Sequence, residues 1–571
     1  MKRNDLTRCL VLLAAAVTAV LPARAARGAT CAELNGTSIP ASSIGLPTTG
    51  ASVTTTAVTG SPAGDYCSAT VAIHPVDPSA PDILARVNLP ASWNQKALMQ
   101  GGGGYDGSIP NTTVNFTNGP LATTPPPLAQ GYATFSSNSG HVANGLGSQD
   151  GSFAVNSEAL HNFAGDALKK TRDAAVYLIV KRYGSAPRRS YFVGGSSGGR
   201  EALWVVQNTP KDFDGAVAMY PAWNAASLDL QFGRITRALA KPGAYPNPVK
   251  QLLWVNAVVN ACDDLDGLVD GLVSNVAACH FKPETVRCPG GADTGDTCLS
   301  DAQIASIRVY GTPLFIPYRT GSGEFFYPGF NVFVGADLTG SLDLKTQQPT
   351  HELMTSDQAA AAACNPATQS CPYKAMPYFS VFWDQWVKYF VTGNSGFDSL
   401  TLDPQRPGPY RERVSDLLGL QDVNKTDLSA FEKRGGKLLL MHGLADGLVA
   451  TDATTEYYVR LIGDMGLREV RNFARYYTIP GLGHVLGSPS ATGGGFFASW
   501  DPLPALDTWV ESGQAPSGLV TTDQNAATRG RTRPVCEWPS WPRYTGRGDP
   551  NSAASFTCVR STGRDGDNDD D

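Results

Sequence analysis

Residues 194–199 read GGSSGG and place a serine in the pattern Gly-x-Ser-x-Gly. In serine hydrolases this pattern marks a tight turn between a strand and a helix, and the small neighbours let the turn close and a substrate approach. An apolar run at 191–193 precedes the pattern and a helix-forming run at 200–207 follows it. The sequence therefore predicts Ser196 as a nucleophile, and a glycine-rich turn without chemistry is the alternative.

A serine hydroxyl needs a neutral imidazole to accept its proton, and the imidazole needs a carboxylate to fix its tautomer. The chain has seven histidines, and after this kind of turn the acid and then the base follow along the chain. His484 lies in the loop 480–484 directly after a predicted strand at 476–479, and Asp446 lies in the loop directly after a predicted strand at 437–441. We expect these two residues to complete a triad, although a structural histidine and a turn-capping aspartate are the simpler interpretations. His442 is a competing base, but it precedes the acid and lies too near the strand end.

The negative oxygen formed during acyl transfer needs backbone N–H donors. One donor is expected at Ser197, the first residue after the nucleophile, and a second in the loop after an earlier strand. Four glycines at 101–104 occupy that loop, which assigns the second donor to Gly103 or Gly104. A phosphate-binding loop is the rival interpretation, but no lysine follows as that motif requires.

An acidic run at 262–273 reads CDDLDGLVDGLV. Asp263, Asp266 and Asp270 supply carboxylates at close spacing, and hard cations such as Ca²⁺ prefer oxygen ligands of this kind. The backbone carbonyls of Leu268 and Leu272 could complete the coordination shell. The sequence predicts a structural calcium site, and a solvated acidic turn is the alternative.

These residues need elements to position them, and two stretches of the chain alternate short apolar runs with helical patterns. The first covers about 85–235 and the second begins near 435. Alternation of this type predicts an α/β fold, here an α/β-hydrolase core with a mostly parallel, doubly wound sheet. The intervening region loses the alternation, so we expect a catalytic domain at 26–224 and 431–560 and a disulfide-rich lid at 225–430 that carries the calcium site.

The N-terminus predicts export. Residues 1–25 combine a basic start, a short apolar run and small residues near a cleavage site, as a signal peptide does. Ten cysteines remain after its removal, an even number that favours disulfides in a secreted or periplasmic protein. Pairing of neighbours suggests five bridges: Cys31 with Cys67, Cys262 with Cys279, Cys288 with Cys298, Cys364 with Cys371, and Cys536 with Cys558.

The composition also indicates a folded protein and excludes some classes of binding partner. Hydrophobic residues make up 42% of the chain and charged residues 17%, which predicts a large core rather than a disordered chain. No basic patch favours nucleic acid, and no later apolar run is long enough to span a membrane. Residues 561–571 are rich in aspartate and predict a disordered acidic tail.

With these motifs in place, the chain resembles the tannase and feruloyl esterase family. The likeness is carried by the following segments: RYG at 182–184, SYF at 190–192, GGR at 198–200, DFDG at 212–215, GYA at 131–133, GH at 140–141, the acidic loop at 262–279, and the two late loops. The resemblance implies an α/β-hydrolase core with a large lid, structural calcium, and hydrolysis of aromatic-acid esters. By matching positions it implies Ser196, Asp446 and His484 as the triad and the five residues of the acidic loop as calcium ligands.

One departure from the family pattern concerns a disulfide. The resemblance implies a cysteine directly before the nucleophile and another directly after the base, whereas this chain has Gly195 and Val485 there. The loss removes a covalent clamp but no reacting group, so we expect catalysis to survive.

The expected function is hydrolysis of a small aromatic ester, of a hydroxybenzoic, hydroxycinnamic or phthalic-type acid, through an acyl-enzyme. A catalytically inactive binding protein on the same fold is one alternative, and a lipase or peptidase is another. An aromatic segment at 378–390 could stack on an aryl acid, but a helix that buries its own apolar face is the favoured interpretation for most of its rings.

Overall fold

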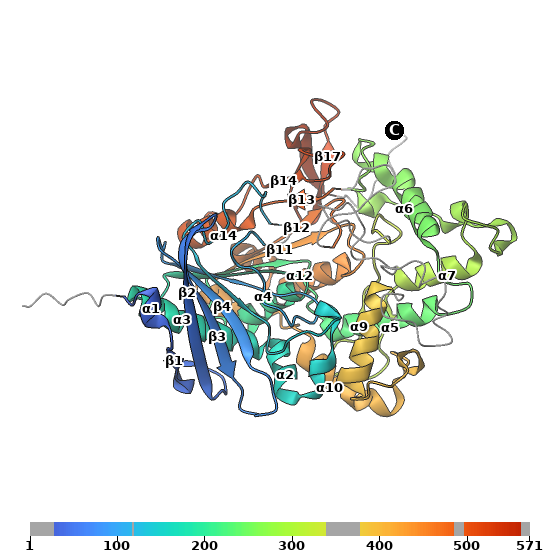
Figure 1. Cartoon of the computed structure of the whole chain (residues 1–571). Coiled ribbons are helices and arrows are strands. Elements are labelled where there is room, and N and C mark those ends of the chain that lie inside the picture. The colour runs from blue at the N-terminus through green and yellow to red at the C-terminus, as the bar shows by residue number, and fades with distance from the viewer. Residues whose placement is uncertain (1–27, 117–118, 339–376, 485–495, 561–571) are drawn as a thin grey trace, which may run out of the picture.

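The computed structural model describes residues 28–116, 119–338, 377–484 and 496–560 (Figure 1). The predicted signal peptide at 1–25, the acidic tail at 561–571, and the pair Cys364 and Cys371 lie outside these ranges. Within them, no helix is long and apolar enough to cross a bilayer.

A single eleven-stranded sheet runs through the described chain in the order β1-β2-β3-β4-β6-β5-β7-β8-β11-β12-β16. Its strands are β1 (Ser38–Ile39), β2 (Gly50–Ser61), β3 (Gly64–His74), β4 (Ile83–Pro90), β5 (Lys96–Gln100), β6 (Ala133–Ser137), β7 (Arg189–Gly195), β8 (Gly215–Met219), β11 (Lys437–Gly443), β12 (Ala474–Ile479) and β16 (Cys536–Glu537). The central strands from β6 to β12 are parallel, whereas β1 to β4 and β16 pair antiparallel at the two edges. This is the α/β-hydrolase fold that the sequence predicts.

The helices are α1 (Cys31–Leu34), α2 (Ser157–His161), α3 (Ala167–Tyr183), α4 (Ser197–Asn208), α5 (Ala225–Leu239), α6 (Pro248–Cys262), α7 (Asp301–Tyr310), α9 (Tyr378–Gln385), α10 (Arg411–Gln421), α11 (Ser429–Lys433), α12 (Thr451–Met465), α13 (Leu467–Phe473) and α14 (Pro502–Ser512). The small sheets consist of β9 (Leu314–Phe315) with β10 (Phe326–Tyr327), of β13 (Ala498–Ser499), β14 (Val520–Asp523) and β15 (Thr532–Pro534), and of β17 (Ser540–Tyr544) with β18 (Phe556–Arg560).

Side chains of the central strands point alternately to the two faces of the sheet, and each face carries a buried hydrophobic cluster. In β7, Tyr191 and Val193 belong to one buried cluster, and Phe192 between them belongs to the other, because successive strand residues point to opposite faces. Leu506 and Trp509 of α14 cover the first face, whereas α3, α4, α12 and α13 pack on the second. The sheet is therefore a buried middle layer, as parallel strands require.

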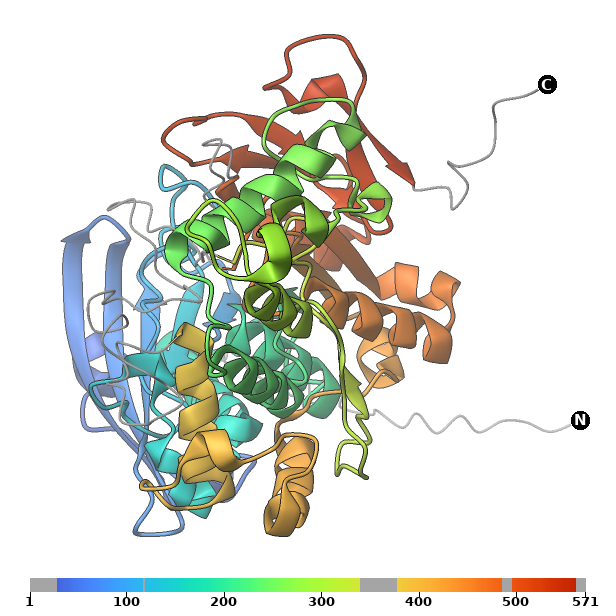
Figure 2. The same cartoon turned by 90° about the vertical axis from the view of Figure 1, so that its right-hand side faces the viewer.

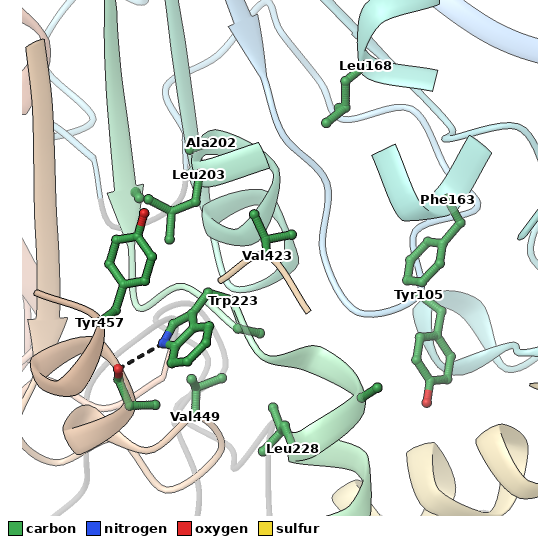
Figure 3. Close-up of a cluster of buried hydrophobic side chains, with 14 of the residues drawn as sticks. Tyr105, Phe163, Leu168, Ala202, Leu203, Trp223, Leu228, Val423, Val449 and Tyr457 are labelled. Atoms are coloured by element: carbon green, nitrogen blue, oxygen red, sulfur yellow. Dashed lines mark hydrogen bonds between the residues drawn. The ribbon is translucent and has the colours of Figure 1, made fainter. Parts of the chain in front are cut away.

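The cluster on the second face also joins the sheet to α5, the first helix of the segment inserted between β8 and β11 (Figure 3). Trp223 is fully buried, and its indole N–H donates to the carbonyl of Ala453 at 2.8 Å. Leu203 of α4, Leu228 of α5 and Tyr457 of α12 belong to the same buried cluster. Burial of such side chains contributes about 1.5–3 kcal/mol each, so this contact holds the first insertion helix against the core.

The insertion leaves and rejoins the core at one place. Asn224 pairs with Asp422 in an isolated antiparallel bridge, and the amide of Val423 donates to the carbonyl of Trp223 at 2.6 Å. Helices α5, α6, α7 and α9 lie on the side of the molecule opposite β2 and β3, and Figure 2 views them face on. We keep the name insertion for residues 225–421 between these paired ends.

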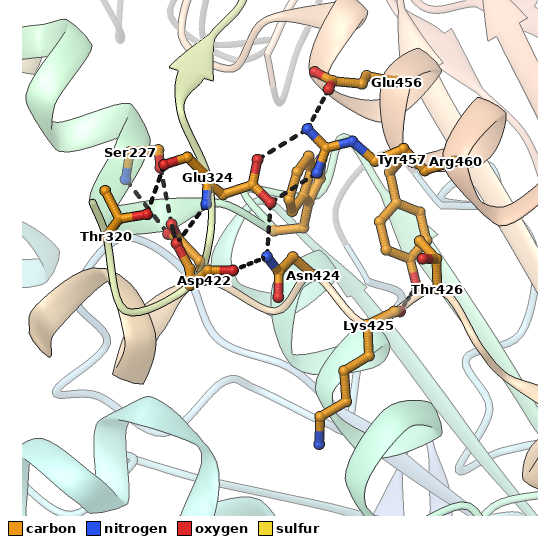
Figure 4. Close-up of polar contacts among 12 residues, drawn as sticks. Ser227, Thr320, Glu324, Asp422, Asn424, Lys425, Thr426, Glu456, Tyr457 and Arg460 are labelled. Atoms are coloured by element: carbon orange, nitrogen blue, oxygen red, sulfur yellow. Dashed lines mark hydrogen bonds and ion pairs between the residues drawn. The ribbon is translucent and has the colours of Figure 1, made fainter. Parts of the chain in front are cut away.

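A polar network reinforces the same junction (Figure 4). Asp422 accepts hydrogen bonds from Ser227 Oγ at 2.8 Å and Ser322 Oγ at 3.1 Å. Glu324, in the insertion, receives two hydrogen bonds from the guanidinium of Arg460 in α12, at 2.7 and 2.9 Å. A bidentate pair of this geometry fixes the orientation of the insertion relative to α12.

Four of the five expected disulfides lie within the described ranges, and all four are formed: Cys31 with Cys67, Cys262 with Cys279, Cys288 with Cys298, and Cys536 with Cys558.

The helical stretch that runs from α2 into α3 is irregular. Residues Asn162–Asp166 form a π-helical turn between α2 and α3. The buried guanidinium of Arg200 donates to the carbonyls of Phe163 and Ala164 at 2.8 and 3.0 Å. These hydrogen bonds satisfy carbonyl groups at the turn, which makes the irregularity stable.

Candidate active site

Ser196 lies at the turn between β7 and α4 with φ 58° and ψ −123°. Only a closely fixed backbone holds a non-glycine residue in this region. The Ser196 amide donates to the carbonyl of Met219 at 3.0 Å, and its carbonyl accepts from Ala222 at 3.1 Å. A Cβ on Gly101 would lie 2.6 Å from the Cα of Gly198, so the preceding loop and the turn are in direct backbone contact. The structure thus forms the strained turn that the sequence predicts.

Asp446 and His484 meet Ser196 at this turn. His484 Nε2 lies 3.1 Å from Ser196 Oγ, and His484 Nδ1 lies 2.8 Å from Asp446 Oδ2. His484 is 3% exposed and Asp446 is fully buried, whereas Ser196 is partly exposed. The imidazole can therefore accept the serine proton at one nitrogen while the carboxylate holds its other N–H.

His442 lies on the far side of the carboxylate. Its Nε2 is 3.1 Å from both Asp446 Oδ2 and the carbonyl of Val449, and its Nδ1 is 2.8 Å from Thr454 Oγ. Two acceptors at Nε2 require a proton there, and in neutral His442 Nδ1 accepts from the Thr454 hydroxyl. This histidine therefore faces the acid and not the nucleophile, as its position at the end of β11 indicated.

Asp446 keeps its charge in spite of complete burial. Burial alone would raise its pKa, but the charge of His484 and the hydrogen bonds from His442 and His484 bring the pKa below the usual aspartate value. Its Oδ1 also accepts from the amides of Leu448 and Val449 at 2.8 and 2.9 Å. A permanently ionised carboxylate is what an imidazole that becomes positively charged requires.

The glycine loop after β5 lies against the start of α4. Ser197 Oγ donates to the carbonyl of Gly104 at 2.6 Å, and the Gly198 amide donates to the carbonyl of Gly102 at 3.2 Å. The amides of Ser197 and Gly104 donate to no backbone acceptor within the part of the chain that the structure describes, whereas the Gly103 amide faces the buried carboxylate of Asp106. Of the two glycines expected to supply the second donor, Gly103 lines the cavity at Ser196 and Gly104 does not.

Two buried acids behind the glycine loop have no counterpart in the sequence prediction. Glu201 Oε2 accepts from the Gly102 amide at 2.9 Å. Burial and the neighbouring charge of Asp106 raise the pKa of Glu201 well above its usual value, and burial also raises the pKa of Asp106. Glu201 follows the nucleophile by five residues on α4, one and a half turns along the helix, so its helical spacing was the only signal in the sequence.

A cavity of about 350 Å³ opens at the nucleophile. Ser196, Gly103, Met219 and Tyr220 line it together with the loop that contains Phe116. A second cavity of about 560 Å³ shares Val114, Asn115 and Phe116 with the first. The side chains that line both are uncharged, and the volumes are those of small-molecule sites.

The aromatic segment of the insertion does not reach this cavity. Phe379, Trp383, Trp386 and Phe390 are buried, and Phe379 stacks on Phe232 of α5 with centroids 5.6 Å apart. The rings are therefore buried by packing, Phe379 within the insertion and Phe390 against Phe153 and Phe163, which is the simpler of the two interpretations.

The acidic loop has calcium-type donors, but its carboxylates do not converge. Asp263 accepts from the amides of Asp270, Gly271 and Leu272 at 2.8–3.2 Å, and Asp266 accepts from that of Leu268 at 3.0 Å. The described ranges contain no group of three His, Cys, Asp or Glu side chains placed to hold a metal ion. The oxygen chemistry fits Ca²⁺, and the arrangement of the loop as it stands does not.

Arginines from the C-terminal part of the chain compensate the loop. Arg533 forms an ion pair with the carboxylate of Asp270, and Arg531 Nη1 donates to its carbonyl at 2.9 Å. Both arginines are nearly buried, at 4% or less exposed. The positive charge at the loop is therefore supplied at least in part by side chains.

Comparison with known proteins places this geometry in a family. The family model for tannase and feruloyl esterase matches residues 67–559. An uncharacterized esterase of Agrobacterium fabrum is 36% identical over 545 residues, which cover 93% of each chain. The mono(2-hydroxyethyl) terephthalate hydrolase of Piscinibacter sakaiensis is 28% identical, over 84% of this chain and 81% of that protein. The crystal structure of feruloyl esterase B from Aspergillus oryzae superposes with a TM-score of 0.69 at 26% identity, over 87% of this chain and 90% of that one. The chain thus belongs to the tannase and feruloyl esterase family and is a carboxylic-ester hydrolase.

Proposed function

We propose that this protein hydrolyses esters of aromatic acids through an acyl-enzyme on Ser196. The observation that carries the proposal is the continuous contact from Asp446 through His484 to Ser196 at the mouth of an uncharged cavity. A cavity of about 350 Å³ with Phe116 and Tyr220 in its wall suits one aryl ring. The activities for which two relatives are named, on a terephthalate monoester and on feruloyl esters, support the same class.

In the first half of the reaction, His484 Nε2 takes the hydroxyl proton of Ser196 while Oγ attacks the ester carbonyl carbon. The carbonyl oxygen becomes negative, and the amides of Ser197 and Gly103 donate to it. The tetrahedral intermediate collapses, the bond to the alcohol oxygen breaks, and His484 gives its proton to that oxygen. The alcohol leaves, and the acyl group remains on Ser196.

In the second half, water takes the place of the alcohol. His484 accepts a proton from the water while its oxygen attacks the acyl carbon, and the same amides stabilise the oxyanion. The bond to Ser196 Oγ breaks, and Oγ recovers its proton from His484. Asp446 stays ionised throughout and stabilises the positively charged imidazole.

The decisive variant is Ser196→Ala, assayed on gallate, ferulate, chlorogenate, paraben and terephthalate esters. We expect turnover to fall by at least about 10³-fold, because the nucleophile is lost while the remaining groups give only residual catalysis. A fluorophosphonate should add one label per chain to the wild type and none to the variant, as intact-protein mass spectrometry would show.

The matched control is Ser306→Ala. Ser306 is a buried serine of α7 that donates to the carbonyl of Ala244 and lies outside the site. Equal rates in Ser196→Ala and the wild type would refute the mechanism. Anilides and long-chain esters in the same assay test the peptidase and lipase alternatives, and preference for either would refute the aromatic-acid assignment.

A further inference from the structure

We infer that Tyr220 is the positioning residue that holds His484 over the nucleophile by filling the space beside Gly195. The inference rests on the proposed roles of Ser196 and His484. Tyr220 follows β8 directly, is 2% exposed, and contributes to the wall of the cavity at Ser196. Sequence reasoning gave it no role, because no motif includes it.

The first contact is with the residue before the nucleophile. A Cβ built on Gly195 would lie 2.4 Å from Tyr220 Oη and 2.5–2.6 Å from two of its ring carbons. Real Cβ atoms do not approach other atoms so closely, so the ring rests directly on the backbone of Gly195. Glycine at this position is therefore required by the tyrosine.

The second contact is with the base. The rings of Tyr220 and His484 meet edge to face, with centroids 4.8 Å apart and planes inclined by 64°. The ring of His442 is a second neighbour of Tyr220, with centroids 6.4 Å apart and planes inclined by 69°. One rigid ring thus touches the backbone next to the nucleophile and the imidazole that must accept its proton.

The backbone of Tyr220 is fixed by the ends of two strands of the central sheet. Tyr220 adopts φ 34°, a conformation that is strained for a tyrosine, and its amide donates to the carbonyl of Met441 in β11 at 2.6 Å. Met219, its neighbour, accepts from the Ser196 amide. The ends of β8 and β11 therefore set the position of the ring, and the ring transmits that position to the base.

Displacement of His484 should slow catalysis, because proton transfer requires the imidazole to lie at hydrogen-bonding distance from Ser196. A displacement of about 1 Å at a reacting group can cost about 10²-fold in rate. His484 lies five residues beyond the end of β12, so strand pairing does not fix its side chain directly. Tyr220 adds a rigid ring contact to the hydrogen bond that Asp446 makes with the imidazole.

The test separates a positioning role from a purely lining role. In Tyr220→Leu, we expect kcat for an aryl ester to fall about 10- to 100-fold with KM changed less than about threefold. Tyr220→Phe keeps the ring and should stay within about threefold of the wild type in both constants. Tyr132→Leu is the matched control, because Tyr132 is a buried ring of the same apolar cluster that packs against the ring of Tyr191.

Gly195→Ala provides a second, independent readout. The added methyl group collides with Tyr220, so the variant should lose activity in the wild-type background and lose no more in the Tyr220→Leu background. Additive losses in this double-mutant cycle would overturn the inference. So would wild-type kcat in Tyr220→Leu, a change confined to KM, or an equal loss of kcat in Tyr132→Leu. Failure of the proposed function has a different signature, namely turnover that survives Ser196→Ala.

Discussion

The carboxylate of Asp446 receives hydrogen bonds from two imidazoles on the same oxygen, at 2.8 Å from His484 and 3.1 Å from His442. Only the first imidazole can reach Ser196. The second has its proton fixed at Nε2 by Val449 and Asp446, and Thr454 saturates its other nitrogen. His442 therefore helps to fix the orientation and charge of the acid, while the proposed mechanism assigns the proton transfer to His484.

Removal of the His442 donor should slow catalysis without abolishing it. We expect kcat/KM of His442→Phe to fall about 10- to 100-fold, because a hydrogen bond to a charged group is worth about 1.5–3 kcal/mol. The His442 hydrogen bond also helps to hold the pKa of Asp446 below its usual value, so its loss raises that pKa and moves the acid limb of the pH–rate profile to higher pH. A profile of kcat/KM against pH checks both expectations.

His442→Gln tests whether the donor itself matters, because its side-chain amide can still donate to Asp446. Partial recovery relative to His442→Phe supports the donor role. If both variants lose the same activity and keep the wild-type profile, His442 acts only as packing.

The sequence could indicate those site residues that directly follow recognisable strands. Ser196, Asp446 and His484 follow recognisable strands in the order that this fold requires, and the structure brings all three together. Tyr220 and Glu201 were not predicted as site residues, because their contacts depend on the close approach of segments that are distant in the sequence. No local sequence pattern encodes such contacts.

At the scale of elements, the acidic loop between α6 and Cys279 needs positive charge to balance its carboxylates. We propose that it binds a structural Ca²⁺ through the carboxylates of Asp263, Asp266 and Asp270 and the carbonyls of Leu268 and Leu272, with the carboxylates turned from their present amide partners. The proposal is supported by the burial of Asp263 and Asp266 and by the oxygen-rich donor set.

Calcium binding predicts a shift in thermal stability. Metal at 100 times its dissociation constant stabilises the folded state by about 2.7 kcal/mol, so the melting temperature should fall on transfer from calcium to a chelator. Asp266→Asn should abolish this difference. Asp264→Asn is the matched control, because Asp264 is the exposed acid of the same loop.

The opposite outcome is equally specific. If melting is identical in calcium and in chelator, the loop relies on Arg531 and Arg533 for its positive charge, and the calcium proposal is wrong. Arg533→Met should then destabilise the protein on its own, because Asp270 would lose its ion-pair partner.

The strands show what pattern alone can and cannot predict. The predicted strand at 437–441 extends to Gly443, because His442 and Gly443 still pair with Thr478 and Ile479. The N-terminal hairpin of β2 and β3 was not predicted as part of the sheet. Its exposed, threonine-rich β2 lacks a continuous apolar run, and long-range pairing with β4 through β3 secures it.

At the scale of the whole molecule, the core and the insertion are joined by the pair of Glu324 and Arg460. The glutamate is 3% exposed, and the arginine side chain is 28% exposed and lies over the ring of Trp223. Breaking a buried pair leaves an uncompensated charge at the junction, so this contact contributes more than a surface ion pair does.

We therefore expect Arg460→Met to lower the free energy of unfolding by about 3 kcal/mol, near the lower end for buried pairs because the arginine is partly exposed. The shift of the urea midpoint measures it. Arg308→Met is the control, since its pair with Glu284 is exposed on both sides and should contribute about 1 kcal/mol or less. Equal midpoints for the two variants would show that the junction does not depend on the Glu324 pair.

The four disulfides are consistent with an extracellular protein, since such bridges persist in oxidising compartments. We propose export to the periplasm or the medium, which recovery of the mature chain from those fractions would test.

The bridge between Asn224 and Asp422 has a consequence for how such enzymes diversify. Because the insertion begins and ends at hydrogen-bonded neighbours, its length and content can change without moving the strands that carry the reacting groups. Recombination at these two points would transfer the whole segment between relatives as a cassette. The chemistry would then be inherited with the sheet, and the cassette could vary on its own.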